Sequence, residues 1–531
     1  MLLVKLIFVL NINPSKTAVQ IKQILDQSDP LKKFSKSQIN SVLYNNPKVF
    51  KQNDRIPPKW NALITWEQKI TLEAKTDING FDTSLYKGCP ARVWQKEALI
   101  KWKQKGYRGV IEAVTGTGKT KVGIIAAADA IALGNDVLIL VPGGTLLNQW
   151  FDESRQNLGG SIQIGRFDMS HKDTFKEHHL IISTIQSARN KEIVPHSNEG
   201  LLIADEVHGY GSEKSSQALR DGYKYRLGLT ATYDRNDNGL DEKLGPYFSP
   251  YKIYIPGKEI IKGCGYARGL KDKILAEFRV AMIGIDFEPE EQNEYEYLDN
   301  SVKKIRTKLI QDHNCPIEPF GEYMRTVQTL SKGGHADYIG TYLARNFLNK
   351  FSERKKLLAV STNKLDALKL LVKVIKHANR SLVFTETIES AENAVNLFNK
   401  FGIVARAFHG KLDPLLKNSL MYKFRTGAVS LLAAPKVLDE GIDVPEADVG
   451  IILAASHTKR QMIQRMGRII RPKEDERPAT FFILYIRHTS EDPECGTHES
   501  FLEEMNQHAM EVQKFSDDDR KRIFEWYKKG L

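Results

Sequence analysis

A glycine-rich segment at residues 111–120 is the feature that most constrains the fold of this chain. It reads Ile-Glu-Ala-Val-Thr-Gly-Thr-Gly-Lys-Thr, and the Ala- and Ile-rich residues 121–133 follow it. A strand feeding such a turn points successive backbone N–H groups into one concavity, and glycines let the backbone approach phosphate oxygens without a Cβ clash. The segment therefore predicts a strand, a phosphate-binding loop and a helix whose positive N-terminus faces the phosphates. A tight strand-to-helix turn without a ligand is the alternative, because so short a pattern also occurs by chance.

The residue types in this loop predict a nucleotide site. Lys119 is expected to meet the β- and γ-phosphates, and the Thr120 hydroxyl is expected to bind Mg²⁺. The backbone N–H groups that line the phosphate cradle would come from Thr115, Gly116, Thr117 and Gly118. ATP and Mg²⁺ are therefore the expected cofactors.

Length and charge set the outer bounds. A chain of 531 residues with 41% hydrophobic content should divide into about three or four globular units with real cores. Lys and Arg outnumber Asp and Glu by 77 to 65, and the resulting net charge of +12 favours binding of a polyanion. A generally basic soluble protein is the alternative.

The cysteines and the first residues indicate the compartment. The four cysteines lie far apart with no C-x-x-C pair, which argues for a reducing environment and against a zinc site. Residues 1–10 are apolar around Lys5, but the run is too short to span a bilayer and no small-residue cleavage site follows it. We expect a protein that is neither secreted nor membrane-bound and that works in the cytosol of a bacterium or of a virus-infected host, or in a eukaryotic nucleus.

Three apolar runs after the loop predict parallel strands. They cover residues 136–142, 180–187 and 201–204, with helical patterns between them. Alternating strands and helices predict a parallel sheet, and such sheets bind ligands at the carboxyl ends of their strands. The third run ends in Asp205, expected to reach the Mg²⁺ shell, and Glu206, expected to orient and deprotonate the attacking water. A strand that merely ends in acidic surface residues is the alternative.

Residues 1–65 predict a small winged-helix domain. Apolar spacing predicts helices over 17–27 and 35–43, and two short strands follow. Side chains four apart share one face of the second helix, and a wing aromatic joins them in an expected phosphate-binding set: Lys36, Asn40, Tyr44 and Trp60. An ordinary winged helix, in which the aromatic residues only pack the wing, is the alternative.

A second group of apolar runs predicts another parallel sheet within residues 376–485, and no second phosphate-binding loop occurs in the sequence. Residues 258–375 contain an apolar run near 283–287, and the residues after it are charged and have a helical pattern. A helical insertion that clamps a duplex is expected there, with a plain connector as the alternative. Residues 486–531 predict a charged tail with one amphipathic helix.

These motifs, in this order, resemble those of superfamily-two helicases with a D-E-V-H box. The resemblance covers roughly residues 85–485 and rests on five segments: 113–120, 141–145, 205–208, 229–232 and 464–471. The Tyr-Asp-Arg-Asn-Asp run at 233–237 is similar to the XPB-type group and to phage branch-migration helicases. The first domain resembles Z-alpha domains, which grip left-handed nucleic acid.

The resemblance implies roles for further residues. Gln95 would read the adenine edge, and Gly441 and Asp443 would lie near the ribose and phosphates. Arg468 and Arg471 would be arginine fingers, for which an exposed basic helix is the alternative. Contacts with the nucleic-acid backbone are implied for Gly144, Thr145, Thr184, Gln186 and Thr385. Coupling between the ATP site and the nucleic-acid groove is implied for Thr230, Thr232 and Gln464.

The expected fold class is α/β, with two tandem RecA-like parallel-sheet domains between a small winged-helix (α+β) domain and a short helical tail. The predicted boundaries are a winged helix at 1–65, a connector at 66–85, the ATP-binding domain at 86–257, the insertion at 258–375, the second RecA-like domain at 376–485 and the tail at 486–531.

The expected function is that of an ATP-dependent DNA helicase or translocase that unwinds, anneals or branch-migrates DNA in repair, recombination or replication. Its expected partner is duplex, forked or branched DNA, with Z-form duplex as the sharper expectation for residues 1–65. Three alternatives stay open: a binding module that uses ATP only as a switch, a translocase that remodels nucleoprotein or transcription complexes without separating strands, and an RNA helicase.

Overall fold

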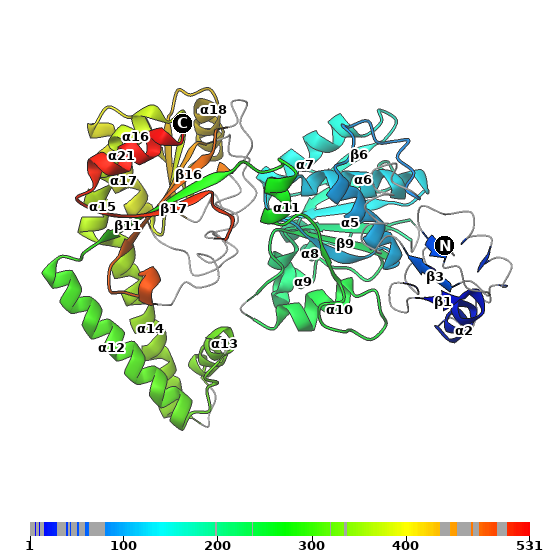
Figure 1. Ribbon diagram of the computed structural model, residues 1–531, viewed down its shortest axis with the longest axis horizontal. Helices are drawn as coiled ribbons and strands as arrows, with labels where there is room; N and C mark the ends of the chain where they lie inside the picture. Colours follow the sequence, from blue (N-terminus) through cyan, green and yellow to red (C-terminus); the bar gives the residue numbers. More distant parts are fainter. Residues whose placement is uncertain are drawn as a thin grey trace. The chain divides into compact units, whose positions relative to one another are not determined.

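The computed structural model describes residues 80–196, 199–235, 237–318, 320–333, 337–435, 447–453, 469–470, 477–495 and 507–531, and before residue 80 it describes 6, 10, 15–28, 35, 39–40, 43, 50–52 and 59–62. The described residues fall into two compact units (Figure 1). One unit comprises Met1–Phe81 with Cys89–Gln104, and the other comprises Asp82–Gly88 with Lys105–Leu531. No helix in this described part of the chain is long and apolar enough to cross a membrane.

The first unit contains helices and a small antiparallel sheet. The helix expected over 17–27 is present as α2 (Ala18–Ser28), with Ile21 and Leu25 buried, and residues 39, 40 and 43 are helical. The sheet has the order β1-β3-β2, and a further helix, α5, belongs to the same unit. The bounds are β1 (Lys16–Thr17), β2 (Phe50–Gln52), β3 (Lys59–Ala62) and α5 (Val93–Gln104). The winged helix stays a prediction, because much of 1–65 lies outside the described residues.

The first large sheet has seven parallel strands in the order β10-β4-β9-β8-β5-β7-β6. Both faces are covered, as the continuous apolar strands require. Helices α6 and α7 pack on one face, while α8, η1, η2 and α10 pack on the other. The strands are β4 (Arg108–Glu112), β5 (Val137–Val141), β6 (Ile164–Phe167), β7 (Leu180–Thr184), β8 (Leu201–Asp205), β9 (Tyr225–Thr230) and β10 (Ile260–Lys262). The helices are α6 (Lys119–Ala132), α7 (Gly144–Asn157), α8 (Ile185–Asn190), η1 (Val207–Gly211), α9 (Glu213–Ser216), η2 (Leu240–Leu244) and α10 (Gly245–Phe248).

The second large sheet is also parallel and seven-stranded, with the order β13-β14-β12-β15-β16-β11-β17. One face packs on α16, α17 and α21, and the other packs on α11 and α18. The strands are β11 (Phe278–Ile285), β12 (Ser381–Thr385), β13 (Ala405–Ala407), β14 (Leu431–Pro435), β15 (Val449–Ile452), β16 (Ala479–Ile486) and β17 (Glu511–Ser516). The helices are α11 (Tyr266–Lys271), α15 (Thr362–Ala367), η3 (Leu368–Leu371), α16 (Val372–His377), α17 (Ile388–Lys400), α18 (Pro414–Arg425) and α21 (Arg520–Lys529). Two tandem RecA-like sheets are thereby confirmed.

Two elements of this sheet differ from the sequence expectation. Strand β11 was expected in the connector, yet it pairs along its whole length with β16. Strand β17 was expected in a helical tail, yet it pairs with β11 and forms the edge of the sheet, and only α21 matches the predicted tail helix. Both strands are placed by partners distant in the sequence, which local patterns do not reveal.

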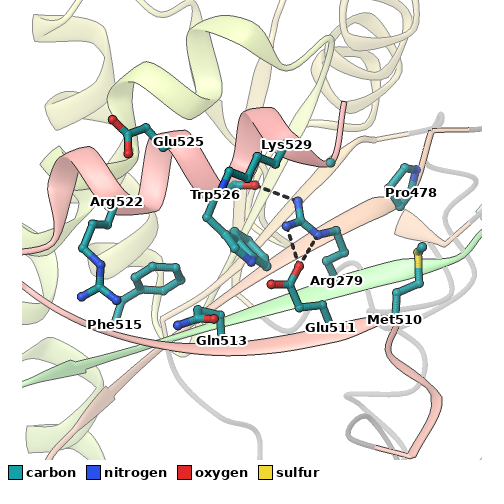
Figure 2. A pocket seen from close by; sticks show the side chains of 11 residues that line it. Arg279, Pro478, Met510, Glu511, Gln513, Phe515, Arg522, Glu525, Trp526 and Lys529 are labelled. Atoms are coloured by element: carbon teal, nitrogen blue, oxygen red, sulfur yellow. Dashed lines mark hydrogen bonds and ion pairs between the residues drawn. The ribbon is translucent and has the colours of Figure 1, made fainter.

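Arg279 of β11 holds the C-terminal elements against the sheet, as Figure 2 shows. Its Nε and Nη2 atoms donate to Glu511 Oε2 at 3.0 and 2.6 Å, and Nη1 donates to the Trp526 carbonyl at 2.9 Å. The guanidinium carbon also lies 3.9 Å from the centre of the Trp526 ring. One buried arginine therefore ties β17 and α21 to the second sheet, beside a pocket of about 760 Å³.

Three helices between β11 and β12 form an arm with its own core. They are α12 (Pro289–Asp312), α13 (Phe320–Ser331) and α14 (Tyr338–Val360). Leu309, Tyr323 and Phe347 are nearly fully buried among them, and an ion pair joins Arg354 of α14 to Asp299 of α12. This part of the insertion is helical, as its charge and spacing predict.

Candidate active site

The nucleotide-site candidates meet at one edge of the first sheet because three neighbouring strands end there. Strands β4, β9 and β8 are adjacent and parallel, so their carboxyl ends lie side by side. The phosphate-binding loop follows β4, Thr230 ends β9 and Asp205 ends β8. Neighbouring strands are about 4.8 Å apart, so the three groups fall within reach of one nucleotide.

The phosphate-binding loop has the shape that its glycines predict. Gly116 and Gly118 have φ values of 83° and 95°, a region that side chains disfavour. Gly118 is the N-cap of α6 and brings no side chain of its own to that helix end. The loop is braced from within, because the buried Thr117 hydroxyl donates to the Val114 carbonyl at 2.7 Å. Lys119 is buried, and its Nζ donates to the Ala113 carbonyl at 3.0 Å.

Two hydrogen bonds orient the Asp205 carboxylate at the end of β8. Its Oδ1 accepts the Glu206 N–H at 2.9 Å, and its Oδ2 accepts the Trp150 Nε1–H at 2.7 Å. Burial, and then the neighbouring Glu206 carboxylate, raise the pKa of Asp205 to about 6, although the Trp150 bond and Lys119 act in the opposite direction. The ionised carboxylate is thus short of positive charge, which a divalent cation would supply.

Glu206 has a backbone conformation that is uncommon for a residue with a side chain. Its φ and ψ are 47° and 50°, in the left-handed region, and such strain tends to occur at functional sites. The strained turn makes Glu206 the N-cap of η1, directly after the metal-ligand candidate. Its side chain is only 15% exposed, and Oε2 lies 3.5 Å from His208 Nδ1.

His208 links this carboxylate to the end of β9. Its Nδ1 lies 3.0 Å from Thr230 Oγ1, and the Thr230 hydroxyl donates to the Thr232 carbonyl at 2.8 Å. A hydroxyl has one proton to donate, so Nδ1 must carry the hydrogen that Thr230 accepts. The predicted coupling residue Thr230 therefore lies one hydrogen bond from the D-E-V-H segment, and Thr232 lies two hydrogen bonds from it, through Thr230. Sequence analysis gave His208 no role, although its place in the motif was the available signal.

The run after Thr232 folds back on the same segment. Arg235 donates to the His208 carbonyl, and its Nε donates to Asp237 at 2.6 Å. Asp237 in turn accepts the Gly239 N–H at 3.0 Å, which closes a turn. The residues that resemble the XPB-type group thus brace the backbone of the D-E-V-H segment.

The nucleic-acid candidates of the first sheet lie at the adjoining strand ends. Strands β5 and β7 are neighbours and follow β8 in the sheet order. Gly144 and Thr145 are exposed in the first turn of α7, whose N-cap is Gly143. Thr184 caps α8 by accepting the Ser187 N–H at 3.3 Å, and Gln186 is exposed. Helix N-termini and hydroxyls at an open edge suit phosphate contact.

The structure describes only some of the other predicted site residues. Thr385 is fully buried at the end of β12 and donates to the Thr387 carbonyl at 3.0 Å, so its hydroxyl faces no solvent in this conformation. Gln95 is buried on α5 and accepts the Arg92 N–H at 2.8 Å. Asn40 is helical and half-buried, and Trp60 lies on β3. The remaining predicted residues lie outside the described residues: Lys36, Tyr44, Gly441, Asp443, Gln464, Arg468 and Arg471.

The site suits ATP with a divalent cation. A loop of left-handed glycines ends in a helix N-terminus, a buried lysine lies beside it, and Asp205 is a buried carboxylate whose pKa is raised by burial and by Glu206. Two pieces of the chain also match known families. Residues 89–235 match the family described as "Type III restriction enzyme, res subunit", and residues 363–473 match "Helicase conserved C-terminal domain".

Several known proteins are similar over most of this chain. The DNA 3'-5' translocase XPB2 of Sulfurisphaera tokodaii is 29% identical over 390 residues, which are 72% of this chain and 79% of that protein. The DNA 3'-5' helicase XPB of Mycobacterium tuberculosis is 28% identical, and the match covers 75% of this chain and 61% of that protein. The solved structure of S. cerevisiae Dbp5 bound to RNA and ADP BeF3 shares the fold, with a TM-score of 0.50 and 12% identity, over 82% of this chain and 97% of that one.

Two tandem parallel sheets, with a P-loop and an acidic pair at the edge of the first, define a superfamily-two helicase, an ATPase that depends on nucleic acid. Within that superfamily the sequence is similar to proteins of the XPB group.

Proposed function

We propose that this protein couples Mg-ATP hydrolysis to movement along DNA, either as a helicase that separates strands or as a translocase on the duplex. The observation that carries the proposal is the meeting of Lys119, Asp205 and Glu206 at one sheet edge, with exposed backbone-contact candidates at the next two strand ends. The 3'-5' direction in the names of the two XPB relatives supports the same direction here.

The proposed mechanism assigns one task to each group. Lys119 and the N–H groups of the loop would hold the phosphates, while Thr120 and Asp205 would hold Mg²⁺, which would neutralise phosphate charge. Glu206 orients the attacking water and accepts its proton. The hydrogen bond between His208 and Thr230 couples movements of the acidic pair to the end of β9. Sequence-independent contacts at Gly144, Thr145, Thr184 and Gln186 would let the motor step along any sequence.

ATP turnover against a panel of nucleic acids tests this function. Single-stranded DNA, blunt duplex, forked duplex, a four-way junction and RNA of matched length would each be titrated at fixed Mg-ATP. Stimulation by DNA with strand displacement on the fork supports a helicase, and stimulation by duplex without displacement supports the translocase that remodels bound complexes. Stimulation by RNA alone supports the RNA-helicase alternative, and nucleotide binding with no stimulated turnover supports a switch.

Arg468→Ala should lower DNA-stimulated turnover by at least about tenfold while ATP affinity changes little. We propose Arg468, with Arg471, as a finger that reaches the γ-phosphate only after nucleic acid has closed the cleft. Basal and stimulated rates would be measured with Arg425→Ala, a loss of the same charge at the end of α18, as the control. Equal loss of basal and stimulated rates would contradict gating by the second domain.

Deletion of residues 1–65 should weaken DNA binding several-fold and leave the maximal ATPase rate at saturating DNA nearly intact. We propose that Lys36, Asn40, Tyr44 and Trp60 form a separable nucleic-acid face, so its affinity should fall as salt rises. The sharper proposal is Z-form binding: the full chain, but not Tyr44→Ala, would shift an alternating CG duplex to the left-handed circular-dichroism spectrum. Unchanged DNA affinity after the deletion would instead favour a protein-docking role.

A further inference from the structure

The indole of Trp150 joins three parts of the site that are distant in the sequence. Trp150 lies on α7 and is fully buried, and its Nε1–H donates to Asp205 Oδ2 at 2.7 Å. The ring packs against Gly123 of the P-loop helix α6, and Leu229 of β9 lies beside the same glycine. One side chain of α7 thus contacts both the P-loop helix and the metal-ligand candidate at the end of β8.

Gly123 lies where a side chain would collide with the Trp150 ring. A Cβ atom on Gly123 would lie 2.6 Å from Trp150 Cη2 and 3.2 Å from Leu229 Cδ1. Glycine in a helix interior is normally unfavourable, because it loses more backbone freedom than alanine on folding. Its presence in the middle of α6 is explained by the close approach of the Trp150 ring.

The hydrogen bond from Trp150 fixes the direction of the Asp205 carboxylate. The Glu206 N–H binds one carboxylate oxygen and the indole N–H binds the other, so rotation of the carboxyl group would break both bonds. Each carboxylate oxygen can accept more than one hydrogen bond or ligand, so both keep capacity for a metal. An indole N–H only donates, so Trp150 orients Asp205 without competing as a ligand.

Helix α7 also carries a candidate nucleic-acid contact in its first turn, and Trp150 lies near the middle of the same helix. Thr145 is exposed in the first turn, and Trp150 follows five residues later, a rise of about 7.5 Å along the helix axis. A helix of this length moves as one piece, so a displacement of its first turn moves the indole as well. Because the donor and acceptor are already at 2.7 Å, a small displacement changes the bond to Asp205.

We infer that Trp150 is a positioning residue that transmits nucleic-acid contact at the first turn of α7 to the metal-binding carboxylate Asp205. The inference rests on the proposed function, since it gives the Asp205 site a metal and α7 a nucleic-acid contact. It adds a route of coupling through α7 to the one through His208 and Thr230.

The decisive variant is Trp150→Phe, which keeps an aromatic ring in the pocket and removes the N–H donor. Affinity for a fluorescent ADP analogue would be titrated with Mg²⁺ and with EDTA. We expect about tenfold weaker binding with Mg²⁺, the size of one hydrogen bond to a charged group, and unchanged binding in EDTA. ATP turnover should need more Mg²⁺ for half-maximal rate, and its stimulation by DNA should fall. Trp526→Phe, which removes a buried indole from helix α21 on the second sheet, should change none of these.

Each outcome decides the inference. Equal loss of affinity with Mg²⁺ and in EDTA, or no loss in either, would show that Trp150 only packs the site. If Trp150→Phe fails to fold, Gly123→Ala replaces it, because the added methyl displaces the ring while the indole N–H stays; a parental Mg²⁺ requirement in that variant would overturn the inference. If Trp150→Phe binds nucleotide more weakly with Mg²⁺ but is still fully stimulated by DNA, Trp150 only orients Asp205. That result would refute transmission along α7. A parental protein that binds Mg-nucleotide but is never stimulated by DNA would refute the proposed function, while the comparison with EDTA would still test the bond to Asp205.

Discussion

Glu206→Gln should lower DNA-stimulated ATP turnover by about 1000-fold and leave nucleotide affinity within about twofold of the parental value. The change removes the charge and the basicity of the carboxylate without altering the phosphate loop, which lies on another strand end. The backbone of residue 206 should keep its left-handed turn, because the Glu206 N–H still donates to Asp205 Oδ1. Single-turnover hydrolysis and titration of a fluorescent ATP analogue would measure the two effects separately.

The same variant should accumulate an ATP-bound complex on DNA, because binding and cleft closure precede the step that it blocks. Slow dissociation of labelled DNA in the presence of ATP, but not of ADP, would report that state. Glu213→Gln is the matched control, since Glu213 is 82% exposed and pairs with Lys243 on the surface of the same domain. Turnover by Glu206→Gln at the parental rate would remove Glu206 as the base and leave the acidic pair with only a metal-binding role.

Much of the site follows from the sequence because parallel sheets impose their own geometry. The apolar runs before Gly116 and Asp205 predict buried strands, and the carboxyl ends of parallel strands share one edge. Thr230 was expected near the ATP site only because of the helicase resemblance. Local patterns thus place the loop and the acidic pair at one edge without knowledge of the strand order. Contacts between elements need that order: α7 and β8 meet through Trp150 and Asp205, which are 55 residues apart. The sequence signal for that contact is the isolated Gly123 within a helical pattern, because the Trp150 ring packs against it.

The second sheet shows the limit of local patterns more clearly. Strand β11 contains Arg279 and Gly284, which interrupt its apolar run, and its position depends on pairing with β16 about 200 residues later. Strand β17 contains only two apolar residues, Val512 and Phe515, and it lies at a sheet edge where alternate side chains are more exposed, so its apolar signal is weak. Arg279 of β11 adds hydrogen bonds to Glu511 of β17 and to the Trp526 carbonyl of α21, and these contacts become visible only in three dimensions.

Lys119→Ala should weaken ATP binding by at least about 30-fold, since a buried charged group that binds phosphate contributes about 2 kcal/mol or more. Lys119 is buried beside the loop, and its Nζ already lies 3.0 Å from the Ala113 carbonyl, so little rearrangement would bring it to a phosphate. The loss should appear with Mg²⁺ and equally in EDTA, because the ammonium contacts phosphate oxygens directly. That pattern separates Lys119 from Asp205 and Trp150, whose effects should require the metal.

Lys121→Ala is the control, because it removes the same charge two residues later on α6, where the side chain is half-exposed. It should bind nucleotide like the parental protein, so a loss in both variants would indicate a general effect of charge rather than a phosphate contact.

Thermal unfolding without nucleotide should be nearly unchanged in Lys119→Ala, since the variant removes a buried cation together with its hydrogen bond to a loop carbonyl. Nucleotide should then raise the melting temperature of the parental protein but not that of the variant. Parental affinity in Lys119→Ala would mean that phosphates bind elsewhere and that residues 111–120 form only a tight strand-to-helix turn.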